Sequence, residues 1–369
     1  MHALVYHGPG KQAWESVPDP SIIDATDAVV RIDSSTICGT DLHIMKGDTP
    51  EVEPGRVLGH EAVGTVVEIG AAVTTIAVGD RVLVSCVSSC GRCRFCKEGH
   101  YGICSGGGGW IFGYMIDGLQ AEFARVPFAD NSLYKVPPAL SDEQVLFVAD
   151  ILPTAYEIGV LNGRVVPGDT VAIVGAGPIG LATIMTAKLH TPGRIIAIDL
   201  ADSRLDKALE FGADVVINNG NEDAVAKVME LTDGLGVDVA IEAVGVPPTF
   251  ELCTELIRPG GRVANVGVHG ECVTLHLEKL WIRDVMITTG IVDTRTTPML
   301  LKLIEGGRFD PTVFATHHFP LSDTVEAYEV FGAAAETGAL KVVLQAVPAD
   351  LTHDDHHMEA PAAKTPVHA

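Results

Sequence analysis

The sequence has few basic residues. Its 369 residues include 25 Lys and Arg against 48 Asp and Glu, which gives a formal net charge of -23. A surface with this charge repels nucleic acids and anionic membranes, because both are polyanions. We therefore expect neither as a partner, and we interpret the acidity as a property that favours solubility.

We also expect neither a membrane-spanning apolar run nor a secretory leader. No stretch reads as a continuous apolar run of membrane-spanning length, although 47% of the residues are hydrophobic. The first residues, MHALVYHGPG, contain neither the basic region nor the apolar run of a signal peptide. We expect a cytoplasmic protein whose core is divided between two domains, because single cores stop growing well below this length.

Four of the eight cysteines lie in one short segment, in the pattern Cys90-x2-Cys93-x2-Cys96-x7-Cys104. Four thiolates so spaced can surround one tetrahedral zinc, which is then closed to substrate. An iron–sulphur cluster is an alternative, but its usual bacterial run has a shorter last gap followed by proline, where this chain has Ser105. A redox pair needs only two cysteines, and disulfides belong to secreted chains. We prefer a structural zinc, so catalysis must occur elsewhere.

The pattern of the chain changes near residue 153. Before it, β-branched runs broken by glycine and proline, such as DAVVRIDSSTIC and DRVLVSC, predict an irregular β-rich region. After it, strands alternate with helical stretches, beginning with TVAIVGAGPIGLATIMTAKL, which predicts a doubly wound parallel sheet and an α/β fold. Residues 349–369 are polar and rich in His, and we predict a disordered tail. Adventitious metal binding by its histidines is the less favoured alternative.

A dinucleotide motif follows the first strand of this second region. Gly175, Gly177 and Gly180 form GxGxxG between an apolar strand and a predicted helix. The first glycine allows a tight turn, the second lets the backbone approach a pyrophosphate, and the third lets the helix pack on the strand. Pro178 and Ile179 complete the turn, and the helix N-terminus would hold the phosphates.

The end of the next predicted strand favours NAD over NADP. Asp199 lies there, about 20 residues further on, as in dinucleotide-binding folds. Its carboxylate would accept hydrogen bonds from the adenosine ribose hydroxyls and would repel a 2′-phosphate. Arg204 is a nearby residue that could hold a 2′-phosphate, but beside Asp199 we expect it to reach the ribose.

Two further metal-ligating residues lie upstream in separate segments. Cys38 lies in ICGTDLH and His60 in LGHEAVG, and this mixture of ligands is typical of a catalytic zinc with an open position. Singly, each is more often a buried thiol or a core imidazole. Spacing alone does not identify the third ligand.

The segments CGTDLH, GHEAVG, the four-cysteine run and GAGPIG, in this order and at these spacings, resemble the zinc-dependent medium-chain alcohol dehydrogenases. The likeness runs from about residue 1 to 346. It implies a GroES-like, β-rich catalytic domain made of residues 1–152 and 295–348, with a structural zinc lobe at 88–106. It also implies a Rossmann NAD-binding domain at 153–294.

The resemblance places the third catalytic zinc ligand at Asp150, in VADILPTAYE. Many members have Cys there, whereas bacterial secondary alcohol dehydrogenases and the formaldehyde-dehydrogenase-like branch have Asp, and the intact four-cysteine lobe fits the latter branch better. The alternative role of Asp150 is to cap a helix. Glu61, next to His60, matches a family Glu that can enter or leave the fourth position of the zinc. Two Zn2+ per chain are therefore expected, one catalytic and one structural.

The resemblance also implies a mechanism in which zinc, as a Lewis acid, lowers the pKa of a bound alcohol while hydride passes to NAD. Thr40 and His43 match the family's proton relay to solvent, and imidazole suits this role because it titrates near physiological pH. Capping of a loop is their alternative role. Thr154 matches a residue that packs on the nicotinamide. Lys341 matches a basic residue near the pyrophosphate, with a solvated surface lysine as the alternative.

By family position, Cys86 and Trp110 would line the alcohol pocket. The small Cys86 leaves room for a branched carbon and Trp110 offers an apolar wall, so we expect a small primary or secondary aliphatic alcohol. Polyol and threonine dehydrogenases remain the enzymatic alternatives. A noncatalytic dinucleotide-binding protein and a zinc-free quinone reductase are the alternatives from other classes. The resemblance to bacterial members of the family implies a homotetramer, with a dimer as the alternative.

Overall fold

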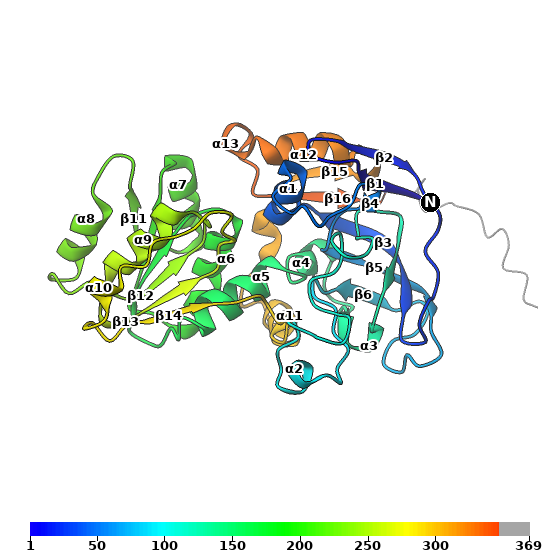
Figure 1. The fold of residues 1–369 in the computed structure, drawn as a ribbon, viewed down its shortest axis with the longest axis horizontal. Helices are drawn as coiled ribbons and strands as arrows, with labels where there is room; N and C mark the ends of the chain where they lie inside the picture. Colours follow the sequence, from blue (N-terminus) through cyan, green and yellow to red (C-terminus); the bar gives the residue numbers. More distant parts are fainter. Residues whose placement is uncertain (347–369) are drawn as a thin grey trace, which may run out of the picture.

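The computed structural model describes residues 1–346, and the tail predicted at 349–369 lies outside the described residues. The strands form two large sheets in separate halves of the molecule, joined by two stretches of chain (Figure 1). We name these halves the β-rich domain and the parallel-sheet domain.

The parallel-sheet domain has six strands in the order β11-β10-β9-β12-β13-β14, all of them parallel. This is the strand order of the Rossmann fold, whose ligands lie at the carboxyl ends of the strands where the order reverses. The strands are β9 (Thr170–Val174), β10 (Arg194–Asp199), β11 (Val215–Asn218), β12 (Val237–Glu242), β13 (Ile257–Asn265) and β14 (Met286–Thr289).

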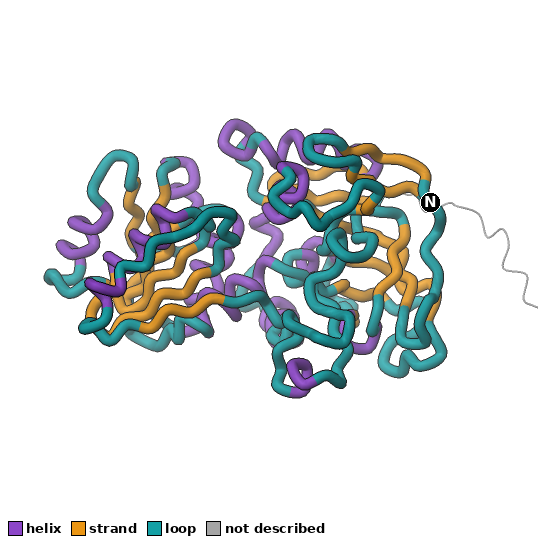
Figure 2. Tube along the Cα trace, in the orientation of Figure 1, coloured by secondary structure: helices purple, strands orange, loops and turns teal. Residues whose placement is uncertain are grey.

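Helices flank this sheet (Figure 2), so both of its faces are buried. Alternate residues of β9 enter two different cores: Val171 and Ile173 pack with Leu181 in one, and Ala172 and Val174 pack in the other. Burial on both faces explains why the strands read as continuous apolar runs. The helices are α6 (Pro178–Ala187), the short η2 (Lys188–His190), α7 (Asp202–Phe211), α8 (Ala224–Leu231), α9 (Pro247–Leu256) and α10 (Leu277–Leu280).

The β-rich domain contains a mostly antiparallel sheet in the order β15-β16-β3-β5-β6-β8, with β7 also paired to β3, and a smaller sheet β2-β1-β4. The last two strands return to this domain after the parallel sheet is complete. The strands are β1 (His2–Tyr6), β2 (Gln12–Ser16), β3 (Ala28–Thr36), β4 (Arg56–Val57), β5 (Ala62–Ile69), β6 (Arg81–Val84), β7 (Phe123–Val126), β8 (Leu133–Lys135), β15 (Ala315–Pro320) and β16 (Lys341–Gln345).

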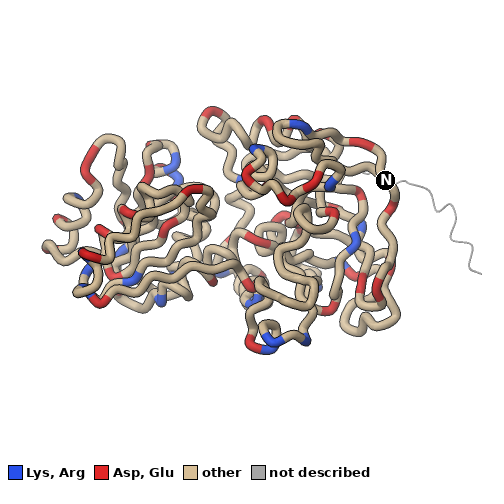
Figure 3. The backbone as a smooth tube through the Cα atoms, in the orientation of Figure 1, with Lys and Arg blue, Asp and Glu red and all other residues tan. Residues whose placement is uncertain are grey.

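Shorter helices lie between these strands (Figure 1). They are α1 (Gly39–Lys46), α2 (Arg94–Lys97), α3 (Ala129–Ser132), α4 (Asp142–Leu146), α11 (Thr297–Glu305), η3 (Pro311–Phe314), η4 (Leu321–Asp323), α12 (Thr324–Gly332) and α13 (Ala334–Thr337). Acidic residues are distributed over both domains rather than gathered in one patch (Figure 3).

The first connection between the domains is the helical run Asp142–Leu161, which includes α4, α5 (Ile151–Thr154) and the π-helix η1 (Ala155–Leu161). By length and composition alone this run is long and apolar enough to cross a membrane, so our expectation that no run reaches that length is wrong. Its apolar window is 78% buried inside the fold, as in the core helix of a soluble protein. The predicted domain boundary at 152/153 falls inside α5.

The second connection, between β14 and α11, contains a strained residue at the other predicted boundary, 294/295. Thr294 is 2% exposed and has a φ of 56°, which is unusual for a β-branched residue. Its hydroxyl lies 2.9 Å from Ser85 Oγ, and its carbonyl accepts a hydrogen bond from the Tyr134 hydroxyl. The buried carboxylate of Glu157, on η1, accepts hydrogen bonds from Thr296 N and Oγ1, both at 2.8 Å. The two connections are therefore tied to each other.

Candidate active site and metal centres

The four-cysteine segment folds around a common point. The sulphur atoms of Cys90, Cys93, Cys96 and Cys104 all lie within 4.8 Å of one another, and two of the pairs are 4.0 Å apart. Tetrahedral Zn–S bonds of about 2.3 Å place sulphurs about 3.8 Å apart, so this arrangement fits one zinc. All four are free thiols, which contradicts the disulfide alternative.

Backbone amides face the sulphurs of this segment. Cys96 N lies 3.5 Å from Cys93 Sγ, and Cys93 N lies 3.4 Å from Cys90 Sγ. The hydrogen bond from the Cys96 amide is the main reason that the pKa of Cys93 falls to about 5. Amides that stabilise the thiolate form favour metal binding by this segment, because the thiolate is the form that binds metal.

A second cluster forms in the β-rich domain from residues that are far apart in the chain. Ligand atoms of Cys38, His60, Glu61 and Asp150 all lie within 4.8 Å of one another. Asp150 Oδ2 is 3.5 Å from Cys38 Sγ and 3.4 Å from His60 Nε2. Cys38 lies at the N-cap of α1 and Asp150 at the N-cap of α5, where the Asp150 carboxylate makes no capping hydrogen bond. The helix-capping alternative for Asp150 is therefore wrong.

The donor set of this cluster suits zinc. One thiol, one imidazole and two carboxylates match the ligand types that zinc accepts in sites with an open position. Glu61 Oε2 is buried and has no hydrogen-bond partner among the described residues, so a cation in the cluster would satisfy it. The residues present therefore fit a metal ion.

Sequence reasoning missed the residue that orients His60. Asp41 Oδ1 lies 3.3 Å from His60 Nδ1, while Asp41 Oδ2 accepts a hydrogen bond from Cys38 N at 2.9 Å. The two atoms form an ion-pair contact and not a hydrogen bond, and a carboxylate facing Nδ1 favours the tautomer in which Nε2 keeps the lone pair that a metal requires. Gln120 and the Tyr328 hydroxyl extend this network. The signal was present in CGTDLH, because Asp41 lies three residues after the N-cap, the spacing of a capping box.

Charges inside the cluster shift the pKa values of its members in opposite directions. Burial lowers the pKa of His60, but the charge of Asp41 and the hydrogen bonds to Asp150 outweigh it, so the pKa lies well above its usual value. Burial raises the pKa of Asp150, but its hydrogen bond and charge interaction with His60 dominate and lower it. Asp150 is therefore held as a carboxylate, the form that ligates a metal.

Lys341 does not lie on the surface, so the alternative of a solvated lysine is wrong. It is 1% exposed, and its Nζ donates to Glu61 Oε1 at 2.7 Å and to Ile37 O at 2.8 Å. Burial raises the pKa of Glu61 to about 7 even though the Lys341 charge opposes this. In this arrangement Lys341 balances the charge of the metal cluster, and its contact with a pyrophosphate stays a prediction.

The remaining residues predicted around the catalytic metal lie at the edge of this cluster. Thr154 donates its hydroxyl to Asp150 Oδ1 at 2.6 Å, and Cys86 Sγ lies 3.7 Å from the same oxygen. The Trp110 ring meets the His60 ring edge to face at 6.2 Å and stacks on Tyr114 at 4.7 Å. Substrate contact by Cys86 and Trp110 and nicotinamide packing by Thr154 stay predictions.

The two relay candidates both lie on α1. Thr40 Oγ1 is 3.7 Å from Cys38 Sγ, so its hydroxyl is beside the cluster. His43 lies one turn further along, half-exposed, with Nδ1 2.8 Å from Asp48 Oδ2. The pair therefore extends from the cluster toward solvent, and its relay role stays a prediction.

The glycine motif adopts the geometry of a dinucleotide-binding turn. Gly175 follows β9 with a φ of 100°, and a Cβ on Gly180 would collide with Gly175 O. A Cβ on Gly177 would meet nothing within 4 Å, so open space lies above the N-terminus of α6. Pro178 and Ile179 form the first residues of α6. These features fit a pyrophosphate at this helix N-terminus.

Asp199 ends β10 beside this turn. Its Oδ2 accepts a hydrogen bond from Ala176 N at 2.7 Å, and its Oδ1 accepts one from Leu200 N at 2.8 Å. Arg204 Nη1 is 4.0 Å from Asp199 Oδ2, and its side chain is exposed. The strand end, the turn and the arginine thus lie together, and their contacts with ribose stay a prediction.

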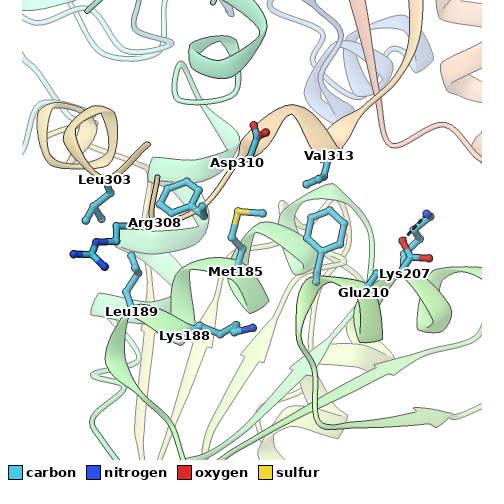
Figure 4. Close-up of a pocket in the computed structure, with 11 residues that line it drawn as sticks. Met185, Lys188, Leu189, Lys207, Glu210, Leu303, Arg308, Asp310 and Val313 are labelled. Atoms are coloured by element: carbon cyan, nitrogen blue, oxygen red, sulfur yellow. Dashed lines mark hydrogen bonds and ion pairs between the residues drawn. The ribbon is translucent and has the colours of Figure 1, made fainter. Parts of the chain in front are cut away.

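A cavity of about 740 Å³ lies elsewhere, between the far end of α6, α7 and the loop after α11 (Figure 4). Its lining mixes apolar side chains, such as Met185 and Phe211, with charged ones, among them the Lys207–Glu210 ion pair. No residue of either metal cluster or of the glycine motif lines it.

Comparisons with known proteins agree with the geometry of both domains. The family model described as the alcohol dehydrogenase GroES-like domain matches residues 24–138, and that of the zinc-binding dehydrogenases matches residues 178–306. An alcohol dehydrogenase of Cupriavidus necator is 39% identical over 364 residues, covering 94% of this chain and 98% of the relative. The L-threonine 3-dehydrogenase of Pyrococcus horikoshii is 34% identical and covers 86% of this chain and 91% of its own.

Solved structures extend the likeness to three dimensions. The zinc-dependent alcohol dehydrogenase 2 from Streptococcus pneumonia, in its apo form, has a TM-score of 0.90 and 50% identity, with 94% of this chain and 98% of the other covered. The alcohol dehydrogenase TADH from Thermus sp. ATN1 has a TM-score of 0.88 and 38% identity, with 94% and 100% covered. The fold is thus a GroES-like domain joined to a Rossmann domain, and the chain belongs to the zinc-dependent medium-chain alcohol dehydrogenase family.

Proposed function

We propose that this chain catalyses the reversible, zinc-dependent oxidation of a small primary or secondary alcohol to an aldehyde or ketone, with hydride transfer to NAD. The convergence of Cys38, His60, Asp150 and Glu61 on one point carries the proposal. A noncatalytic dinucleotide-binding protein or a zinc-free reductase would not need four metal-ligating groups gathered inside the β-rich domain.

The chain's own residues would hold two zinc ions. Cys38, His60 and Asp150 would bind the catalytic ion, which when bound supplies Lewis-acid chemistry to an alcohol or carbonyl oxygen. Glu61 would act as an exchangeable carboxylate near it. The four sulphurs of the lobe at 88–106 would leave no open position for the second ion, whose role would be structural.

The side chains around the catalytic cluster would then orient the reaction. Thr40 would hydrogen-bond the alcohol, and His43 would take the proton toward solvent. Thr154, whose hydroxyl is held by Asp150 at 2.6 Å, would present its methyl group to the nicotinamide. Cys86 and Trp110 would form apolar walls that exclude water from the reacting carbon. The exclusion of water would strengthen the electrostatic interactions inside the site.

We propose NAD rather than NADP because Asp199 places a carboxylate where a 2′-phosphate would lie. Relatives with 27% and 28% identity carry NADH and NADP respectively, so family membership alone does not decide the choice. The exposed Arg204 is the residue that would favour NADP, and it lies 4.0 Å from the Asp199 carboxylate. Rates with the two cofactors at equal concentration test this choice.

The second candidate is oxidation of a polyol or of threonine, which the likeness to a threonine 3-dehydrogenase supports. Threonine carries a carboxylate that requires a cation. Lys341, the buried cation beside the cluster, already pairs with Glu61. An uncharged alcohol therefore fits the described residues better.

We also propose a homo-oligomer, a tetramer or a dimer, and a cytoplasmic location. The edge strand β14 and the segment before it expose apolar side chains, among them Trp281 at 74% and Ile282 at 72%. Burying such an edge against a second copy would remove both the apolar surface and the unpaired strand. Light scattering on Trp281→Lys tests the assembly, with the equally exposed Ile23→Lys as the control.

The cytoplasmic location is supported by the cysteines, because eight free thiols suit a reducing compartment.

One experiment tests the central proposal. Reduction of NAD would be followed by absorbance with a panel of small alcohols, polyols and threonine, on wild type and on Asp150→Ala, with zinc measured on both. We expect turnover of propan-2-ol or butanol, and loss of both activity and one zinc per chain in the variant. The proposal fails if Asp150→Ala keeps both zinc ions and its rate, or if a polyol or threonine is strongly preferred.

A further inference from the structure

Outside the metal cluster, the most specific unassigned contact near the proposed relay is between His43 and Asp48. Nδ1 of His43 lies 2.8 Å from Asp48 Oδ2, with both side chains about half-exposed. From this contact we propose that Asp48 is a positioning residue that holds His43 in one tautomer for proton transfer. This inference rests on the proposed function, in which His43 takes the proton from the alcohol.

The backbone directs Asp48 back toward His43. α1 ends at Lys46, its C-cap Gly47 has a left-handed φ of 87°, and Asp48 then donates its backbone N–H to His43 O at 3.0 Å. A Cβ on Gly47 would press on the Pro9 ring, and Gly10 N donates to Met45 O at 2.8 Å. The turn is therefore held both from within the helix and from the loop after β1.

Helix stability does not explain a carboxylate in this position. The C-terminal end of a helix carries partial negative charge, so an acidic side chain just beyond it is unfavourable for the helix. An imidazolium in the last turn is favourable for the same reason. The role of Asp48 is therefore its contact with His43 and not the stabilisation of α1.

The chemistry of imidazole gives the consequence. When Nδ1–H donates to the Asp48 carboxylate, Nε2 holds the lone pair and is the atom that accepts a proton. The carboxylate then stabilises the imidazolium that forms, as in a Ser–His–Asp triad. Because the His43 ring is half-exposed, its proton can pass to water.

A second pair in the same domain provides a matched control. His7 Nε2 lies 3.2 Å from Glu15 Oε2, with half-exposed side chains as in the first pair. Glu15 belongs to β2 and His7 follows β1, so the pair lies at the hairpin that these two strands form. Within the described residues, neither side chain makes a hydrogen bond to a candidate site residue. Loss of this pair should leave turnover unchanged.

The kinetic test compares Asp48→Asn, His43→Gln, the double variant and Glu15→Gln in steady-state alcohol oxidation by the zinc-loaded protein, with melting temperatures measured alongside. We expect Asp48→Asn to lower kcat about tenfold, less than the loss of the base itself, with little change in KM for NAD. The same change should cost nothing further in the His43→Gln background. A loss of equal size in both backgrounds, or an unchanged kcat, overturns the proposal.

An NMR experiment reads the tautomer without turnover, so it separates this inference from the proposed function. Protein labelled with 15N in histidine is compared before and after Asp48→Asn, with His43 assigned by the peaks missing from His43→Gln. We expect the Nδ1–H form in the wild type and a mixture of tautomers in Asp48→Asn. An Nε2–H form in the wild type, or identical spectra for His43, contradicts the role of Asp48 even if the enzyme oxidises alcohols.

Discussion

The two metal clusters contrast in how the chain builds them. The four sulphurs of the lobe come from one segment of the chain, and backbone amides face them. The ligands of the catalytic cluster come from Cys38, from His60 and Glu61, and from Asp150, and side chains support them. One segment thus supplies all four sulphurs of the lobe, whereas three separate parts of the chain supply the ligands of the catalytic cluster.

Under the proposed function, this difference separates a metal site that is closed from one that has an open position. Four thiolates fill the coordination shell of one zinc and leave no open position. The mixed set carries buried charges, beside which lie the Asp41 carboxylate and the Lys341 ammonium group. Variants that touch one cluster should therefore leave the other intact.

The largest effect is expected in the lobe. Cys96→Ser removes a ligand whose metal contributes about 10–16 kcal/mol in isolated zinc-binding peptides. We expect the loss of one zinc per chain and a fall of at least about 10 °C in melting temperature, since about 1 kcal/mol shifts a large domain by a few degrees. The exposed Cys272→Ser is the control. Retention of two zinc ions by Cys96→Ser would show that the lobe does not bind as described.

Lys341→Met should cost about 3–5 kcal/mol of unfolding free energy, because it leaves Glu61 buried without its partner. The double variant with Glu61→Gln should recover much of the loss. Denaturant unfolding measures both. If the single and double variants are equally unstable, the ion pair is not the cause.

The pH dependence of the Lys341→Met effect follows from Glu61. Its pKa is raised from 4.5 to about 7, so the folded state binds more protons and stability falls as pH rises through this interval. Lys341 lowers this pKa, and its removal must raise it further. The cost of Lys341→Met should therefore be larger at pH 9 than at pH 5. Zinc-stripped protein is used, since a dication would itself lower the pKa. An equal cost at both pH values would contradict this account.

Asp41→Asn should weaken only the catalytic metal. Loss of a carboxylate that orients a histidine ligand lowers metal affinity about 10–100-fold. Competition with a chelator measures the two zinc ions separately, because the lobe should release its ion as in wild type. Asp117→Asn, which alters an exposed carboxylate paired with Arg56, is the control. Equal weakening of both zinc ions would mean that the clusters are not independent.

The smallest effect is expected at Thr294, on the connection that borders both regions. The adjacent Asp293 accepts a hydrogen bond from Gly102 N in the lobe at 2.9 Å, and Thr294 contacts Ser85, next to Cys86. Thr294→Gly relieves a left-handed conformation that costs about 1–2 kcal/mol and loses a hydrogen bond of about 1 kcal/mol. We expect a change within about 1 kcal/mol.

The buried Thr324 provides the contrast for Thr294. It has a φ of -56°, and its hydroxyl donates to Leu321 O. Thr324→Gly relieves no strain, so it should cost about 2 kcal/mol from the lost hydrogen bond and the flexibility of glycine. Calorimetry compares the two variants. Equal costs would mean that Thr294 stores no strain.

Local patterns predicted much of this molecule. The run from Gly175 to Gly180 and the apolar strands read directly as a parallel sheet, because each signal lies within a few residues. The lobe followed from cysteine spacing in the same way. Asp150 was placed only by resemblance, since no local pattern connects it with Cys38, which lies 112 residues away.

What sequence reasoning missed depends on long-range contacts. The ion pair of Lys341 with Glu61 joins residues 280 positions apart, and nothing around GALKVVL indicates a buried charge. The π-helix Ala155–Leu161 and the strained Thr294 arise where two domains constrain the backbone. By contrast, Asp41 was readable from its capping position and was overlooked.

The late position of Lys341 in the chain sets an order of maturation during synthesis. A ribosome that adds about 5–20 residues per second completes the lobe about 240 residues before it reaches Lys341. The lobe can thus bind its ion roughly 10–50 s before the catalytic cluster obtains its balancing cation. Until β16 docks beside β3, Glu61 lacks its partner, so the four-cysteine cluster is complete first and the cluster around Glu61 obtains its balancing cation last.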